Sequence, residues 1–161
     1  MYDWLAWIEG SALGRVIRES GPWTYPLVNL THVLGVSTLF GAIVLLDLRL
    51  LGFWRRTPLP GLADAAVPVA TAGFAMAAVS GAGLLATNAT EYAGNPFLLI
   101  KFPAIAIGLV NVAVLSRSNA WRARRTRALA PREERQLAVM GGVSLASWLT
   151  AVTAGRLIGY W

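Results

Sequence analysis

The sequence contains no cysteine and a single histidine, and only 14% of its 161 residues are charged. Without cysteine the chain can form neither a disulfide framework nor a thiolate site for zinc or an iron–sulfur cluster. A water-soluble chain carries about 25% charged residues, so this one has too little polar surface to cover itself in water. Hydrophobic residues make up 56% of the sequence instead. These figures exclude collagen, a coiled coil and intrinsic disorder, and they indicate a membrane protein.

Long stretches almost free of charge divide the chain into four hydrophobic spans. Each span supplies the roughly 20 residues that a helix needs to cross about 30 Å of hydrocarbon. The apolar residues do not alternate with a period of two, and a helix satisfies its own backbone hydrogen bonds in lipid. We therefore predict an all-α membrane protein, a single domain over 1–161 in which four transmembrane helices form a bundle. The predicted spans are 24–50, 65–87, 96–116 and 136–160.

The residues before the first span predict a short helix over 3–19 that lies on the membrane surface. Glu9 interrupts the apolar run and no positively charged segment precedes it, so these residues do not resemble a signal peptide. One apolar stripe follows the segment at helical spacing: Leu5, Ile8, Ala12 and Val16.

Arginine is distributed unevenly between the two ends of the predicted spans. Ten arginines fall in or beside the 55–61 and 117–135 loops, whereas Arg15 and Arg18 lie on the opposite side. Short loops rich in arginine remain in the cytoplasm. The pattern predicts a multi-pass protein of the bacterial inner (plasma) membrane with both termini in the periplasm. This topology and contact with anionic lipid of the bilayer explain the basic loop, so no nucleic-acid partner is expected.

Small residues recur at every fourth position on the second and fourth spans. Such rows let helix backbones approach closely, so we interpret them as packing faces. Together with the single histidine, they lead us to expect a homo-oligomer or a partner membrane subunit. The two rows are Gly73, Ala77 and Gly81, and Ser147, Ala151 and Gly155.

Four ionisable side chains lie inside the predicted spans: His32, Asp47, Lys101 and Arg156. Such groups are costly in lipid and are therefore candidates for function. With a helix rise of ~1.5 Å per residue, three of them share the outer third of the bundle. Asp47 lies near the opposite end of its helix, where we expect it to pair with Arg49 at the membrane interface.

The outer group of residues favours the hypothesis of a b-type haem site used for electron transfer. Neutral imidazole is a good ligand for haem iron, so His32 is the candidate metal ligand. Gly35, one turn further on, would leave space beside the ring. Lys101 and Arg156 would contact the propionates. The second axial ligand would come from a homodimer, from another subunit or from Met76.

Two other hypotheses use the same residues. Lys101 and Arg156 can extend toward the membrane surface, and His32 can hydrogen-bond to a neighbouring Ser or Thr. The protein would then be a non-catalytic membrane anchor or assembly subunit. Alternatively, a small oligomeric transporter or metal-handling protein would use the same residues as its binding site. No Ser/His/Asp set, phosphate loop or zinc pattern is present, so the sequence leaves open whether the protein is an enzyme.

The segment 80–117 has a distinctive order of features. It reads SGAGLLATNATEYAGNPFLLIKFPAIAIGLVNVAVLSR, a small-residue helix and a polar loop, then a helix with early Lys101 and with Arg117 at its end. This segment resembles the membrane domain of copper-resistance D-type proteins. The segment 32–52, HVLGVSTLFGAIVLLDLRLLG, is similar to uncharacterised bacterial four-helix membrane proteins. The resemblance implies the same helical architecture and copper handling in the inner membrane.

Overall fold

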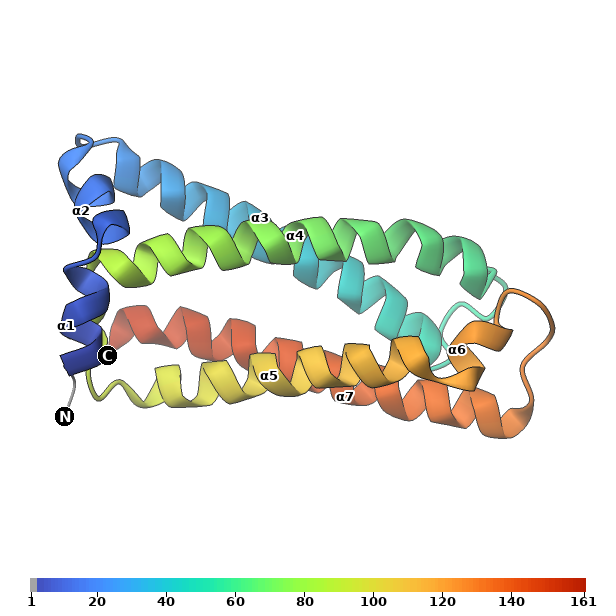
Figure 1. Cartoon of the computed structure of the whole chain (residues 1–161). Helices are drawn as coiled ribbons and strands as arrows, with labels where there is room; N and C mark the ends of the chain where they lie inside the picture. Colours follow the sequence, from blue (N-terminus) through green and yellow to red (C-terminus); the bar gives the residue numbers. More distant parts are fainter. Residues whose placement is uncertain (1–2) are drawn as a thin grey trace.

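Four long helices lie side by side in the structure, a computed structural model that describes residues 3–161 without the side chains of residues 3, 4 and 13 (Figure 1). Each is long and apolar enough to cross a membrane. This confirms the predicted all-α bundle and makes the chain a multi-pass membrane protein. The four helices are α3 (Thr24–Leu50), α4 (Leu59–Thr87), α5 (Pro96–Arg117) and α7 (Pro131–Leu157).

The helices form two antiparallel pairs, α3 with α4 and α5 with α7, which contact each other mainly through α3 and α7. Both chain ends lie at one end of the bundle, which we call the terminal end. We call the opposite end the arginine end; it carries the α3–α4 turn and the short helix α6 (Asn119–Ala123). At the arginine end α3 approaches α7, whereas toward the terminal end α3 diverges from α7 (Figure 1).

Glycines bring the backbones of α3 and α4 into direct contact. A Cβ atom on Gly73 would lie 2.5 Å from the backbone nitrogen of Leu39. One on Gly35 would lie 2.7 Å from the backbone nitrogen of Ala77. The predicted row on α4 is therefore a packing face within the chain, as small residues in membrane helices allow. Because this face is already covered, it gives no reason to expect a homo-oligomer.

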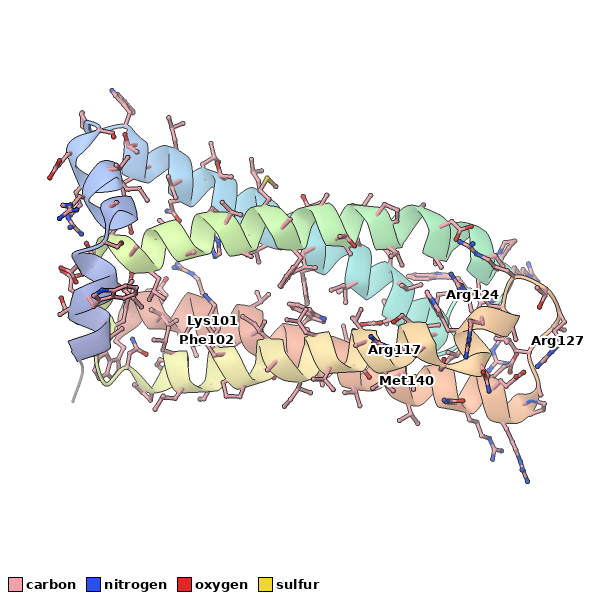
Figure 2. The ribbon with its side chains drawn as sticks, in the orientation of Figure 1. Lys101, Phe102, Arg117, Arg124, Arg127 and Met140 are labelled. Carbon is pink, nitrogen blue, oxygen red and sulfur yellow. The ribbon has the colours of Figure 1, made fainter. Side chains whose placement is uncertain are left out.

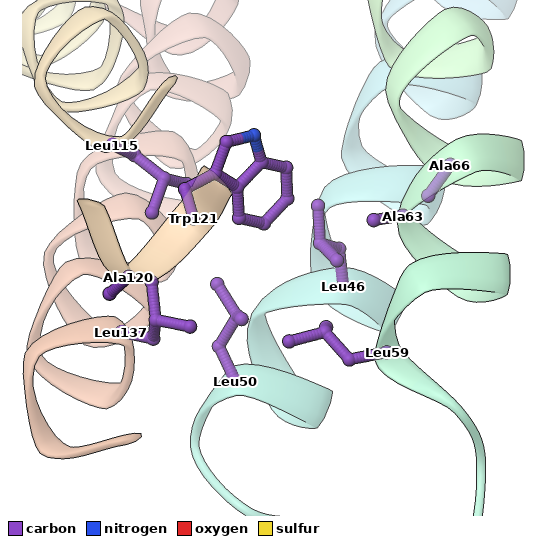
Figure 3. Close-up of a cluster of buried hydrophobic side chains, with 9 residues drawn as sticks. All are labelled: Leu46, Leu50, Leu59, Ala63, Ala66, Leu115, Ala120, Trp121 and Leu137. Carbon is purple, nitrogen blue, oxygen red and sulfur yellow. The ribbon is translucent and has the colours of Figure 1, made fainter. Parts of the chain in front are cut away.

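Two clusters of buried side chains form the core. The first, in the middle of the bundle, contains Leu39, Ile43 and Trp148, and the Trp148 ring meets Phe74 edge-on at 6.0 Å. The second closes the arginine end and joins all four long helices to α6 (Figure 3). It consists of Leu46, Leu50, Leu59, Ala63, Ala66, Leu115, Ala120, Trp121 and Leu137.

Two long helices begin earlier than the hydropathy pattern predicts. α4 begins at Leu59 instead of 65, because Pro60 fits the first helical turn, where a backbone N–H is not needed. α7 begins at Pro131 instead of 136, and Glu133 caps it by accepting the Ala130 N–H at 2.9 Å. Hydropathy locates the apolar part of a helix but not the polar turns that extend it.

The predicted single helix over 3–19 is two helices, α1 (Asp3–Glu9) and α2 (Ala12–Glu19). The chain turns at Gly10, and the Ser11 hydroxyl accepts the Gly14 N–H at 3.3 Å, which caps α2. Gly14 then lies so close to α4 that a Cβ atom would be 2.4 Å from the Ala86 carbonyl oxygen. The break lets both helices pack at the end of α4. That they lie on the membrane surface stays a prediction.

Hydrogen bonds of the Glu9 side chain connect α1 to η1 (Ala89–Tyr92), the short helix that follows α4. The Glu9 carboxylate accepts from the Thr90 N–H at 2.8 Å and from the Thr90 hydroxyl at 2.7 Å. These hydrogen bonds, aided by the Arg18 charge, hold the pKa of Glu9 below its ordinary value. Because the folded pKa is depressed, this contribution to stability is complete above the ordinary pKa of Glu and is lost as the pH falls through the folded value.

We therefore expect Glu9→Gln to loosen α1 and α2 at neutral pH. Hydrogen exchange of the amides of residues 5–19 should become faster in this variant. The matched control is Glu19→Gln, which removes an exposed acid from α2, and its exchange should match that of the unmodified protein. Equal exchange rates in Glu9→Gln and the unmodified protein would show that the Glu9–Thr90 hydrogen bonds do not stabilise α1 and α2.

Candidate functional site

His32 lies on α3 near the terminal end and packs against α4. Its Nδ1 atom is 2.9 Å from the Ala77 carbonyl oxygen and 3.2 Å from the Ser80 hydroxyl. A carbonyl oxygen can only accept, so these contacts assign the proton to Nδ1 and leave Nε2 with its lone pair. Gly81 makes room for the ring, since a Cβ atom there would lie 2.8 Å from His32 Cε1. The ring is therefore held in one orientation and one tautomer.

Lys101 reaches the same region from the other helix pair. Its side chain extends from α5 into the space between the two pairs (Figure 2). It passes over α7 where Gly155 has no side chain, and a Cβ atom on Gly155 would lie 3.4 Å from Nζ. Lys101 is half-buried, and its charge acts on His32. The structure thus brings together two of the site residues predicted from the sequence.

The other two predicted site residues lie elsewhere. The space left by Gly35 is filled by the backbone of Ala77 on α4, so it belongs to the helix contact and leaves no room for a cofactor ring. Arg156 is exposed, and its guanidinium stacks on the Tyr160 ring at 4.5 Å and donates to the Tyr160 hydroxyl. A sequence gives the depth of a residue in the membrane but not the side of the helix on which its contacts form.

Met76 was the expected alternative for a second haem ligand, but it lines a pocket on α4 that Lys101 does not line. It lines an open apolar pocket of about 620 Å³ between α2, α3 and α4. Val28 and Val79 line the same pocket. Of the candidate partners, Lys101 is therefore the one whose charge acts on His32.

Asp47 forms a second polar site nearer the arginine end of α3. Its side chain is only 3% exposed and faces Ser144 of α7, while Oδ2 is buried and has no hydrogen-bond partner among the described residues. The expected pair with Arg49 is wrong, because residues two apart on a helix face different directions. Arg49 instead donates from Nε to the Thr57 carbonyl oxygen at 2.8 Å.

Sequence analysis did not single out the two serines that contact the buried ionisable groups. Ser80 touches His32, and Ser144 touches Asp47. A signal was present, because Ser80 adjoins Gly81 and Ser144 comes one turn before Ser147, so both lie near the rows of small residues. Among the residues whose side chains the structure describes, no group of three His, Cys, Asp or Glu side chains comes together that could hold a metal ion.

Comparisons of the chain with protein-family models, with curated proteins and with solved structures find no match. The resemblance to copper-resistance D-type proteins, and the copper handling it implies, therefore stay predictions. What can be argued about function comes from the geometry of His32 and Lys101.

Proposed function

We propose that this protein binds a b-type haem between its two helix pairs and takes part in electron transfer in the bacterial inner membrane. The observation that carries the proposal is the state of His32. Its Nδ1 atom contacts the Ala77 carbonyl oxygen, which leaves the lone pair on Nε2, and the Lys101 charge is near enough to act on the ring.

Several features of the geometry support this proposal. Histidine ligands in metal sites usually donate their second ring N–H to a carbonyl or carboxylate, which fixes the ring and raises its basicity. His32 has this arrangement before any metal is bound. Toward the terminal end, where His32 lies, α3 diverges from α7 (Figure 1).

Lys101 supplies the second nitrogen of the proposed site. An amine that has released its proton offers a lone pair, and Lys101 extends from α5 of one helix pair, whereas His32 lies on α3 of the other. Ligation by Lys101 would make a second histidine from another chain unnecessary. A homo-oligomer is then not required, whereas a partner that exchanges electrons is part of the proposal.

The test is the ultraviolet–visible spectrum of the full chain, purified from membranes in which haem is abundant. We expect a Soret band and about one haem per chain. Lys101→Leu, which has no ligating atom, should keep the haem but change the spectrum from a six-coordinate to a five-coordinate form. Partial haem loss with an unchanged spectrum would instead assign Lys101 to a propionate. A colourless protein would overturn the proposal and leave the anchor and transporter hypotheses.

We further propose that both termini face the periplasm, which places the haem site near that side. In support, the two chain ends lie together, and labelled Arg117, Arg124 and Arg127 lie at the far end (Figures 1 and 2). Positively charged loops remain in the cytoplasm.

The expected result is that a reporter active only in the periplasm works when fused after Trp161. A reporter that folds only in the cytoplasm should stay dark there. The same two reporters inserted after Ala128, in the loop between α6 and α7, should behave in the opposite way. The reverse pattern would put the haem site at the cytoplasmic face.

A further inference from the structure

An open pocket of about 470 Å³ lies at the arginine end, between the end of α3, the α3–α4 turn, the loop between α6 and α7, and the start of α7. Its rim is strongly basic, whereas the uncharged lining consists mainly of leucines and alanines, with one glycine and one proline. Among the described residues that line it, Glu134 is the one acid. The charged residues of the pocket are Arg49, Arg55, Arg124, Arg127, Arg135 and Glu134.

Arg124 is the unusual member of this group. Its side chain is 9% exposed; one guanidinium nitrogen donates to the Trp121 carbonyl oxygen, whereas Nε is buried and has no hydrogen-bond partner among the described residues. The guanidinium lies 3.7 Å above the centre of the Trp121 ring, and the nearest carboxylate, that of Asp64, is 3.9 Å away and is shared with Arg125. Burial and the neighbouring Arg125 charge lower the pKa of Arg124. The chain thus holds a cation in a partly dry place where the Trp121 ring, one carbonyl and a shared carboxylate compensate its charge in part.

The other arginines of the pocket differ in how many hydrogen bonds and ion pairs they form within the chain. Arg127 forms a bidentate ion pair with Glu133, with N···O distances of 2.7 and 2.8 Å. Arg49 donates hydrogen bonds to two backbone carbonyl oxygens. Arg135 is exposed, and no hydrogen bond to it is found among the described residues. A surplus of positive charge therefore remains in the pocket, concentrated at Arg124 and Arg135.

We propose that this pocket binds the phosphate group of an anionic phospholipid. Guanidinium groups match phosphate oxygens in geometry and charge, and basic pockets at the cytoplasmic ends of membrane helices take anionic headgroups. The leucines of the pocket suit the glycerol and upper acyl chains, which a free phosphate ion does not have. The pocket would anchor the arginine end of the bundle to the anionic leaflet.

The experiment measures lipid retention by the full chain in nanodiscs of phosphatidylcholine with added phosphatidylglycerol, using native mass spectrometry. We compare Arg135→Gln with Arg132→Gln, because both remove one exposed charge from the first turns of α7 but only Arg135 lines the pocket. Arg124→Gln is the third variant. Retention of phosphatidylglycerol should fall about tenfold in the two pocket variants and stay unchanged in Arg132→Gln.

A separate arm adds inorganic phosphate to protein in phosphatidylcholine alone and follows the unfolding midpoint. We expect phosphatidylglycerol to raise the midpoint and inorganic phosphate not to raise it. Equal stabilisation by both would assign the pocket to free phosphate and overturn the lipid assignment. Equal loss of phosphatidylglycerol in Arg132→Gln and Arg135→Gln would show that surface charge alone attracts the lipid. It would overturn the proposal that the pocket binds the lipid phosphate. Arg135→Gln keeps the test valid if Arg124→Gln fails to fold.

Discussion

His32→Ala is expected to remove the proposed haem completely while the four helices remain inserted in the membrane. The variant loses the Nε2 ligand, and nothing else in α3 replaces it. It also loses the hydrogen bonds from Nδ1 to Ala77 and Ser80, which in a membrane protein contribute roughly 0.6–2 kcal/mol. A loss of this size leaves a four-helix bundle folded. The measurement pairs the Soret absorbance per chain with the unfolding midpoint of the apoprotein.

Arg156→Ala is the matched control for this prediction. Arg156 lies inside a span and is ionisable, as His32 is, but it is exposed and stacks on Tyr160. We therefore expect its haem content to equal that of the unmodified protein. Haem loss in Arg156→Ala as large as in His32→Ala would indicate a propionate contact that the geometry does not support. A Soret band retained by His32→Ala would contradict the ligand assignment.

The sequence was informative about the four spans because the bilayer imposes a simple requirement. A helix that crosses hydrocarbon must be long and almost free of charge, so α3 was predicted with the bounds that it has in the structure, Thr24–Leu50. The extra turns of α4 and α7 could not be found in this way. They depend on Pro60 in a first turn and on Glu133 as a cap, and those are local backbone effects.

The candidate site was predictable only in part, for a different reason. A glycine beside a polar group either leaves space for a ligand or lets another helix approach, and the sequence does not distinguish the two. At Gly35 the neighbour is α4. Similarly, the depth of Lys101 could be counted from its helix, but its direction depends on how α5 packs on α7. That packing is set by pairs such as Gly108 and Trp148, which lie far apart in the sequence.

The two polar sites on α3 are separated by the central apolar cluster. His32 lies toward the terminal end and Asp47 toward the arginine end, and Leu39 and Ile43 pack between them with Trp148. The apolar cluster therefore keeps the two polar sites apart along the helix. His32 of α3 is held by Ala77 and Ser80 of α4. The proposed haem site therefore depends most on the contact between α3 and α4.

Gly73→Ala is expected to disrupt that contact and to destabilise the protein by about 3 kcal/mol. The added Cβ atom would lie 2.5 Å from the Leu39 backbone nitrogen and 2.9 Å from the Gly35 carbonyl oxygen. Both neighbours are backbone atoms, so no side chain can turn away and the two helices must separate. His32 and Ala77 belong to the same contact between α3 and α4. The separation would therefore also move His32 away from Ala77 and weaken haem retention.

Gly61→Ala in the same helix is the control, because nothing lies within 4 Å of the Cβ position there. Alanine has the higher helix propensity, so this variant should be unchanged or more stable by up to about 1 kcal/mol. Unfolding of both variants in increasing denaturing detergent gives the comparison, with haem content read from the same samples. If Gly73→Ala unfolds at the same detergent fraction as Gly61→Ala, α3 and α4 do not pack as closely as the structure has them. The fixed orientation of His32 would then lose its physical basis.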